Sequence, residues 1–302
     1  MLSSTPILFP TPCHAFGGHP LPPLFLPAEA GIHCAAAVKG EPILHNFDPI
    51  LLMSVSRFSS LWIYLFFGIA MPGCATQSLL QTSQQLLVVC TDDWNQFQGQ
   101  LQRFERQDLQ SAWKPVGDVV KVCIGKNGLG WGIGLHPHMA TVPQKREGDL
   151  KAPAGVFKVS AVFSKAAENT YRLPLITVGP DTEAIDDPQS KYYNTIVEAH
   201  AVSKDWHSSE KMYEIDQYNL GAVVDHNLPV KDRNAGSCIF LHAWLGENSP
   251  TGGCTAMCVQ DLEVLCQWLD SAKEPLMVQL PVQIYQQYMH DWQLPQVPFL
   301  QH

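Results

Sequence analysis

The densest chemical pattern in the chain joins a histidine, His242, to a cysteine, Cys254, twelve positions later. A predicted strand over residues 237–241 delivers the histidine at its end, and a loop of proline, glycine and small residues leads to the cysteine. A thiolate is a strong nucleophile, and a neighbouring imidazole can take its proton or form an ion pair with it. The pattern therefore predicts acyl transfer, with Cys254 as the nucleophile and His242 as its base.

The residues around the cysteine favour the same chemistry. Gly252 and Gly253 allow a sharp turn, so that consecutive N–H groups, including that of Cys254, can converge on a developing oxyanion. Apolar residues recur with helical spacing up to Asp270, which predicts a helix that begins at Cys254 or Thr255. The N-terminus of such a helix would favour the thiolate over the thiol.

Other cysteines and histidines have simpler interpretations. Cys258 and Cys266 fall on the apolar face of the predicted helix, where core packing explains them. A metal pair formed by Cys254 and Cys258 lacks further ligands at the usual spacing. His136 and His138 are interpreted as part of a surface loop. The sequence thus predicts no metal site.

With these residues in view, the chain resembles the YkuD-type (ErfK/YbiS-like) L,D-transpeptidases. The family signature is a strand-borne histidine, a loop and Ser/Thr-x-Gly-Cys, which His242, Thr251, Gly253 and Cys254 match. Similarity extends to three further segments: Gly148-Asp149 with Pro153-x-Gly155-x-Phe157, residues 186–194, and residues 206–212. Ala152 stands where the first of these segments usually has Thr. The Gly-Cys-Thr-Ala-Met run at 253–257 is similar to a proteobacterial branch of the family.

The resemblance implies a peptidoglycan L,D-transpeptidase without a metal or organic cofactor. Cys254 would attack a tetrapeptide stem donor and form a thioester, which an amine acceptor on another stem then resolves. The resemblance also implies that the carbonyl of Ala243 orients His242 and that the amides of Gly252, Gly253 and Cys254 bind the oxyanion. Ala256 occupies a position where many family members carry Arg.

The remaining site residues are assigned to the substrate. Thr251, Trp244 and Trp206 are expected to line a groove for stem peptides, although core filling is an equal explanation for the two tryptophans. Two other functions stay open at this point. Water could resolve the same thioester, which would make the protein an L,D-carboxypeptidase or amidase. A catalytically inactive, wall-binding lipoprotein is the third alternative.

The elements that must position these residues are mostly strands. Strands are predicted at 85–90, 119–124, 195–197, 221–224, 237–241 and 275–281, and a short helix is allowed between Trp94 and Trp113. We therefore expect a mainly β fold of mixed sheets or a sandwich with few helices, one of which follows the cysteine. The catalytic domain is expected to span residues 84–285, and a C-terminal tail, 286–302, is expected to pack on the surface or fray.

Composition excludes several classes of protein. The 302 residues include 19 Lys and Arg against 28 Asp and Glu, and a net charge of −9 argues against nucleic acid as the main partner. With 46% apolar and 16% charged residues, wholesale disorder is excluded. Nine cysteines cannot all pair with one another. Cys90 and Cys123 fall in two predicted strands, where they form either a disulfide or two buried thiols.

The N-terminal residues have the pattern of an export signal. Arg57, an apolar run over 61–70 and the small residues before Cys74 predict a signal over residues 53–74. Residues 1–52 are then either a non-native extension ahead of the initiator Met53 or a disordered extension. Gly73-Cys74 resembles the lipid-modified site of bacterial lipoproteins, with cleavage alone as the alternative. We expect a periplasmic, cell-envelope protein held at the membrane by the signal or by lipidated Cys74.

Overall fold

The computed structural model describes residues 79–141, 143–166 and 170–300. The predicted extension 1–52, the signal segment 53–74 and Cys74 lie outside these residues. Among the described residues, no helix has both the length and the apolar character needed to cross a membrane.

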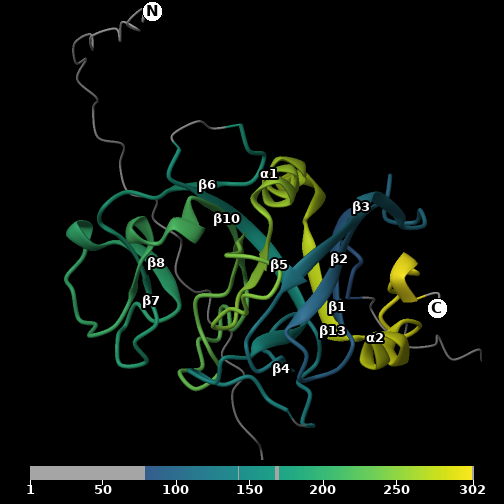
Figure 1. Cartoon of the computed structure of the whole chain (residues 1–302), viewed down its shortest axis with the longest axis horizontal. Helices are drawn as coiled ribbons and strands as arrows, with labels where there is room; N and C mark the ends of the chain where they lie inside the picture. Colours follow the sequence, from purple (N-terminus) through teal and green to yellow (C-terminus); the bar gives the residue numbers. More distant parts are fainter. Residues whose placement is uncertain (1–78, 142, 167–169, 301–302) are drawn as a thin grey trace, which may run out of the picture. The chain divides into compact units, whose positions relative to one another are not determined.

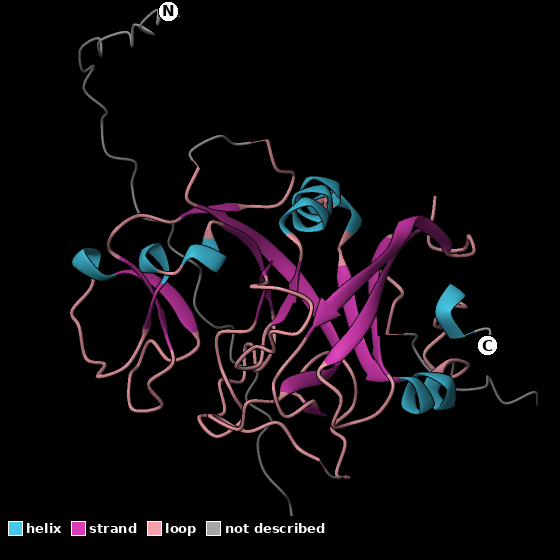
Figure 2. Cartoon of the chain, viewed as in Figure 1, coloured by secondary structure: helices cyan, strands magenta, loops and turns pink. Residues whose placement is uncertain are grey.

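Strands dominate the described part of the chain, and short helices lie around them (Figures 1 and 2). The strands are β1 (Gln85–Thr91), β2 (Gln98–Glu105), β3 (Lys114–Cys123), β4 (Leu129–Trp131), β5 (Ala152–Ser164), β6 (Leu175–Thr177), β7 (Thr182–Ile185), β8 (Thr195–Glu198), β9 (Glu210–Lys211), β10 (Leu220–Val224), β11 (Phe240–Ala243), β12 (Thr255–Met257) and β13 (Leu276–Pro281). The helices are α1 (Val259–Trp268) and α2 (Val282–Tyr288), with 3-10 turns η1 (Ala199–Ala201), η2 (Met212–Glu214), η3 (Asp216–Tyr218), η4 (Ser271–Lys273) and η5 (Pro298–Leu300).

The main sheet closes on itself. Its strand order in the described residues is β10-β11-β12-β3-β2-β1-β13-β5, and β10 pairs back with β5 to complete a barrel of eight strands. The pairs β1–β13 and β11–β12 are parallel, so the barrel is mixed. Closure leaves these strands without a free edge. The mainly β prediction is confirmed, and the structure adds that the sheet forms a barrel instead of an open sandwich.

Two smaller additions complete the sheet structure. β4 and β6 each pair in parallel with the long strand β5, while β7, β8 and β9 form a separate three-stranded sheet. The core follows from the composition of β1 and β13, whose residues are all buried. Such strands are buried on both sides because the barrel interior lies on one face and helices or loops cover the other.

The C-terminal segment is part of this core. Trp292, Leu294 and Val297 are buried in the main apolar cluster, and the hydroxyl of Tyr285 donates a hydrogen bond to the carbonyl of Pro295 at 2.7 Å. Of the two expected alternatives, packing or fraying, these residues show packing, and it extends into the core. Their apolar side chains supply the burial that holds the segment in place.

Two predicted helices differ from the observed elements. The region between Trp94 and Trp113 contains β2, which pairs with β1 and β3, instead of a helix. The helix expected to begin at Cys254 or Thr255 begins only at Val259, because residues 255–257 pair with β11 as strand β12. Sheet hydrogen bonds to a neighbouring strand replace the helical ones there.

The helical pattern holds from Leu262 onward. Leu262, Leu265 and Cys266 are buried on the inner face of α1, as the periodicity predicts. Cys258 is instead the N-cap residue, partly exposed, with Sγ donating to Oδ2 of Asp261 at 2.9 Å. Its assignment to the apolar core is therefore wrong, because the helix begins one turn later than expected.

Cys90 and Cys123 are two buried, free thiols. Cys90 lies in β1 and Cys123 in β3, and β2 runs between them. Strands two positions apart in a sheet are separated by about 9–10 Å. A disulfide requires Cα atoms closer than about 7 Å. The fold thus excludes the alternative of a bond between them.

Candidate active site

Hydrogen bonds of Thr251 fix the loop before Cys254, both within the loop and to the segment after β3. The Thr251 hydroxyl accepts a hydrogen bond from the Gly253 amide at 3.1 Å and donates to the Cys254 carbonyl at 2.6 Å. Backbone bonds of Thr251 to Ile124 and Lys126 fix the loop to the segment after β3. Thr251, expected to contact substrate, therefore shapes the loop, and it also lines the second of the cavities described below.

Gly253 is required by this geometry. Its φ of +154° is a conformation that residues with a side chain rarely adopt, and a Cβ there would lie 2.9 Å from the carbonyl oxygen of Lys151. A Cβ at Gly252 would meet nothing within 4 Å. The backbone therefore requires glycine at position 253, whereas position 252 has room for a side chain.

Cys254 lies at the end of this loop, and its side chain is surrounded by backbone groups. The residue is 7% exposed, and Sγ accepts a hydrogen bond from the Phe240 amide at 3.2 Å and donates to the Cys238 carbonyl at 3.5 Å. β12 follows the cysteine, so activation by a helix N-terminus is wrong. The amide of Phe240 favours the thiolate in its place.

Burial dominates the electrostatics of the thiol. Desolvation, followed by the charge of Glu210, raises the pKa of Cys254 to about 12, while hydrogen bonds from the Phe240 amide and the Tyr218 hydroxyl act in the opposite direction. In the free protein at neutral pH, Cys254 is therefore a thiol. A base must remove its proton before it can act as a nucleophile.

His242 lies on β11, one strand away from the cysteine loop. Its Nδ1 is 2.7 Å from the carbonyl oxygen of Ala243, so Nδ1 carries the proton and Nε2 is the free acceptor. Burial lowers the pKa of His242, which keeps the imidazole neutral at pH 7. The pairing of His242 with Gly221 in β10 and Ala256 in β12 sets its position in the sheet.

Both residues line one cavity of about 210 Å³, here called the acidic cavity. Three carboxylates line it, those of Glu147, Asp186 and Glu210, together with the ammonium group of Lys145. The other lining residues include Ser237, Cys238, Gly252, Gly253 and Tyr218, besides His242 and Cys254. The structure thus brings together the histidine, the cysteine and both glycines that the sequence singled out.

A second cavity of about 240 Å³, the apolar cavity, adjoins the first and shares Tyr218, His242 and Gly252 with it. Trp244, Leu245, Pro250 and other residues of the loop between His242 and Cys254 line it. The imidazole therefore stands between two hollows of different character. One is acidic and contains the thiol, and the other is largely apolar.

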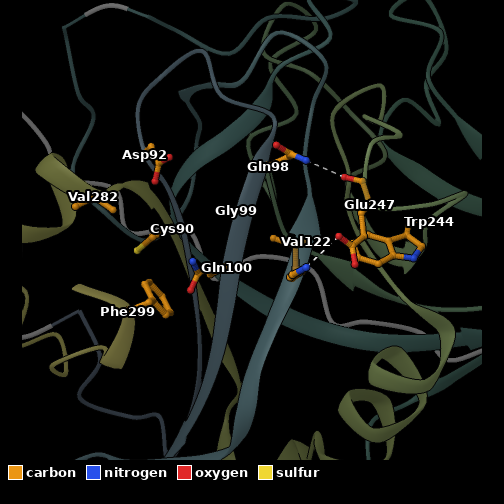
Figure 3. A pocket seen from close by; sticks show the side chains of 11 residues that line it. Cys90, Asp92, Gln98, Gly99, Gln100, Val122, Trp244, Glu247, Val282 and Phe299 are labelled. Atoms are coloured by element: carbon orange, nitrogen blue, oxygen red, sulfur yellow. Dashed lines mark hydrogen bonds and ion pairs between the residues drawn. The ribbon is translucent and has the colours of Figure 1, made fainter. Parts of the chain in front are cut away.

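The same loop borders a third cavity of about 270 Å³, shown in Figure 3. There the Gln98 side chain donates to the Glu247 carbonyl at 3.1 Å, and Lys121 forms an ion pair with the Glu247 carboxylate at 3.0 Å. The thiol of Cys123 donates to the same carbonyl at 3.0 Å. These contacts tether the loop to β2 and β3, and Trp244 lines both this cavity and the apolar cavity.

Trp206 lies elsewhere. It is buried, its Nε1 donates to Oε2 of Glu183 at 2.7 Å, and its ring packs edge-on against Tyr192 at 5.7 Å between centroids. It is absent from the residues described as lining either cavity beside His242. Of the two explanations for Trp206, packing in the core beside the three-stranded sheet fits its position. A contact with substrate in these two cavities does not.

His136, assigned by sequence to a surface loop, is also buried. Its Nδ1 accepts a hydrogen bond from the Val156 amide at 3.0 Å, and its ring packs edge-on against Phe157. The residue supports the barrel because the chain before β5 folds back over that strand. Its surface assignment is wrong.

Several residues of the acidic cavity were missed. The sequence does not single out Glu147, whose Oε2 accepts hydrogen bonds from Tyr193 at 2.6 Å and Ser237 at 2.8 Å. Lys145 forms an ion pair with Asp149 at 2.7 Å, and the Lys145 side chain is only 4% exposed. Burial of these charges depends on contacts with residues far along the chain. No local pattern signals it.

Glu210 and Tyr218 are the other two omissions. Glu210 falls in the segment 206–212, which is similar to the YkuD-type family. That similarity is the one feature of the sequence that could have indicated Glu210 as a site residue. Tyr218 stands in an unremarkable polar stretch. Only the fold brings both to Cys254.

Comparison with known proteins identifies the family of the chain. Residues 83–284 match the model of the YkuD family, described as the L,D-transpeptidase catalytic domain. The chain therefore belongs to the YkuD family. No curated protein matches the chain.

Among solved structures, the helical cell shape determining protein Pgp2 from Campylobacter jejuni is similar to this chain, with 13% identity and a TM-score of 0.32. The match covers 66% of this chain and 50% of that protein, so the chain spans about half of Pgp2.

Proposed function

We propose that this protein is a peptidoglycan L,D-transpeptidase that uses Cys254 as its nucleophile. The thiolate attacks the carbonyl of an L-centre in a tetrapeptide stem, the terminal D-residue leaves, and a thioester remains on Sγ. An amine of a second stem then attacks the thioester and restores the thiol. The observation that carries the proposal is the shared cavity, in which the Cys254 thiol and the neutral imidazole of His242 lie beside two glycines.

The residues divide the chemistry between them. Nε2 of His242 accepts the thiol proton and returns it to the leaving amine, while the Ala243 carbonyl holds Nδ1. The Cys254 amide and its glycine neighbours bind the oxyanion. In the resting structure the Gly253 amide is engaged by Thr251, so Gly253 joins this set only if the loop shifts on substrate binding. The scheme calls for no metal or organic cofactor.

The two adjoining cavities suit two substrates. We assign the donor stem to the acidic cavity, which contains the thiol, and the acceptor to the apolar cavity beneath Trp244. Transfer requires the acceptor amine to reach the thioester before water does. An aromatic wall that excludes water favours transfer over hydrolysis.

This assignment predicts that the full chain, given tetrapeptide muropeptides, forms cross-linked products whose yield rises with added amine acceptor. Replacing Trp244 with Ala should lower the ratio of transfer to hydrolysis about tenfold, the change expected for the loss of ~1.4 kcal/mol of aromatic contact. Chromatography with mass spectrometry measures both products. The control is Trp113→Ala. Trp113 lies in the loop between β2 and β3 and lines neither cavity, so this change should leave the ratio unchanged.

If only tripeptide and free D-residue appear at every acceptor concentration, the protein is an L,D-carboxypeptidase. A second candidate, a wall-binding protein without turnover, is favoured by the burial of Cys254, which is 7% exposed and whose thiol pKa is raised by that burial. Absence of both products, with muropeptide binding retained, would establish that candidate.

We also propose that the protein acts in the periplasm and is attached to the membrane by lipidated Cys74. The basis is the sequence pattern of residues 53–74. Mass spectrometry of membrane-extracted protein should show an N-terminus at Cys74 that carries diacylglycerol, and Cys74→Ser should release the protein from the membrane. An unmodified peptide that spans Phe67 to Gln77 would contradict this expectation.

A further inference from the structure

The third cavity, which borders the loop between His242 and Cys254, takes no part in the scheme above. Its floor is a row of side chains across three strands, because Cys90 on β1, Gln100 on β2 and Lys121 on β3 stand opposite one another in register. Adjacent strands lie about 4.8 Å apart, so this row is about 10 Å long. The cavity, of about 270 Å³, is therefore an elongated trough across the sheet.

An aromatic side chain stands at each end of the trough. Figure 3 shows Phe299 on the side of Cys90, with Gln100 near the middle. Trp244 lies at the other end, beside Glu247. Both rings are partly exposed. The face of an aromatic ring is electron-rich and attracts groups with a partial positive charge. The C–H groups of a pyranose ring, each next to an oxygen-bearing carbon, are groups of this kind.

Two polar side chains of the trough have no protein partner. Within the residues that the structure describes, no side-chain hydrogen bond or ion pair joins Gln100 or Asp92 to another residue, and both are exposed. Gln98 and Lys121 are already engaged by Glu247. A carboxamide offers two N–H donors and a carbonyl acceptor. Gln100 can therefore pair with both the N–H and the C=O of an acetamido group, and Asp92 can accept hydrogen bonds from hydroxyls.

These groups fit an N-acetylated sugar better than a peptide or an anion. β1, β2 and β3 are each paired on both sides, so they offer no free edge to the backbone of an extended peptide. Lys121 is paired with Glu247, and the charge left without a partner is the carboxylate of Asp92, which repels anions. Aromatic ends with a carboxamide between them suit a neutral ring that carries hydroxyls and an acetamido group.

We propose that the third cavity binds N-acetylated amino sugars of a glycan strand, stacked on Trp244 and Phe299, with an acetamido group paired with Gln100. The inference rests on the proposed function, since it takes a stem attached to such a sugar as the acceptor. Trp244 also lines the apolar cavity assigned to that acceptor. Three extended residues reach about 10 Å. An acceptor stem in the apolar cavity can therefore place its own sugar in the third cavity.

The test is the binding of chitotetraose, four linked N-acetylglucosamine units, to the full chain, measured by isothermal titration calorimetry. Cellotetraose has the same backbone with hydroxyls in place of the acetamido groups. Chitotetraose should bind with a Kd of about 1 mM or tighter, and cellotetraose about tenfold more weakly. Gln100→Ala should weaken chitotetraose about tenfold and leave cellotetraose unchanged, because it removes only the partner of the acetamido group. Phe299→Ala should weaken both sugars.

The matched control is Gln110→Ala. Gln110 is an exposed glutamine between β2 and β3 that does not line the cavity, so this variant should bind both sugars as wild type does. Thermal unfolding of each variant shows that the fold is intact. Absence of chitotetraose binding up to about 10 mM would overturn the proposal. Equal affinity for the two sugars would do the same, as would unchanged chitotetraose affinity in both Gln100→Ala and Phe299→Ala.

Sugar binding and turnover can be separated. Cys254→Ala should bind chitotetraose as wild type does, because its sulfur lies in the acidic cavity. Binding needs no reaction, so failure of the sugar site is distinct from failure of the proposed function. In transfer assays, Gln100→Ala should lower the preference for a muropeptide acceptor that carries its disaccharide over a sugar-free stem peptide about tenfold. Equal losses with both acceptors would mean that Gln100 acts on the stem and would overturn the sugar site.

Discussion

Replacement of Cys254 by alanine is expected to abolish muropeptide turnover, with a fall of about 10⁴-fold or more. Every step of the proposed reaction passes through a bond to Sγ, and alanine offers no atom that can form it. The fold should persist, because the change removes one buried atom whose partners are the Phe240 amide and the Cys238 carbonyl. Loss of that acceptor costs about 1–3 kcal/mol of unfolding free energy. Chromatography of the products measures turnover, and thermal unfolding measures stability.

The matched control is Cys258→Ala, four residues along the chain. Cys258 contacts Asp261 at the start of α1 and is not among the residues that line either cavity beside His242. Turnover should stay within about twofold of wild type, and the unfolding free energy should change by about 0.5 kcal/mol. Loss of turnover in Cys258→Ala, with turnover retained in Cys254→Ala, would show that the nucleophile is assigned to the wrong cysteine.

The second large effect concerns His242. His242→Ala is expected to lower kcat/KM by about 10²–10⁴-fold, because it removes the free Nε2 that accepts the thiol proton. Burial lowers the pKa of His242, so the imidazole is already neutral at pH 7 and gains no basic form as the pH rises further. The loss should therefore be equally large at pH 7 and pH 8. Steady-state rates at both values measure it.

Two further variants separate the base from the packing of the ring. His242→Asn retains a donor for the Ala243 carbonyl but has no basic nitrogen, so it should be as impaired as alanine. His290→Ala, at a fully exposed side chain, should have no effect. A His242→Ala variant with the full wild-type rate would remove His242 from the mechanism.

Local sequence patterns determined the core of the candidate site. A strand that ends in His242, two glycines and a cysteine can be recognised over fewer than twenty residues, because each residue acts through its own backbone freedom or side-chain chemistry. The apolar and β-branched content of β1, β10 and β13 likewise predicted strands near their observed positions. The inner face of α1 from Leu262 onward followed from helical periodicity alone.

Other features depended on pairing between distant segments. Residues 255–257 continue a helical pattern by sequence, yet their backbone pairs with β11, so the strand displaces the first turn of the helix. Barrel closure depends on the contact of β10 with β5, about 60 residues apart, which no periodicity in either strand encodes. The burial of Trp206 follows in the same way from its hydrogen bond to Glu183 on β7.

The electrostatics of the site belong to the tertiary structure for the same reason. Glu210 and Tyr218 come from β9 and η3, and Glu147 comes from the loop before β5, yet all three line the cavity of Cys254. A carboxylate acquires a raised pKa only when the fold removes water from it and brings other charges near. The sequence alone therefore predicted which atom is the nucleophile, and only the tertiary structure decided which charged and polar groups surround it.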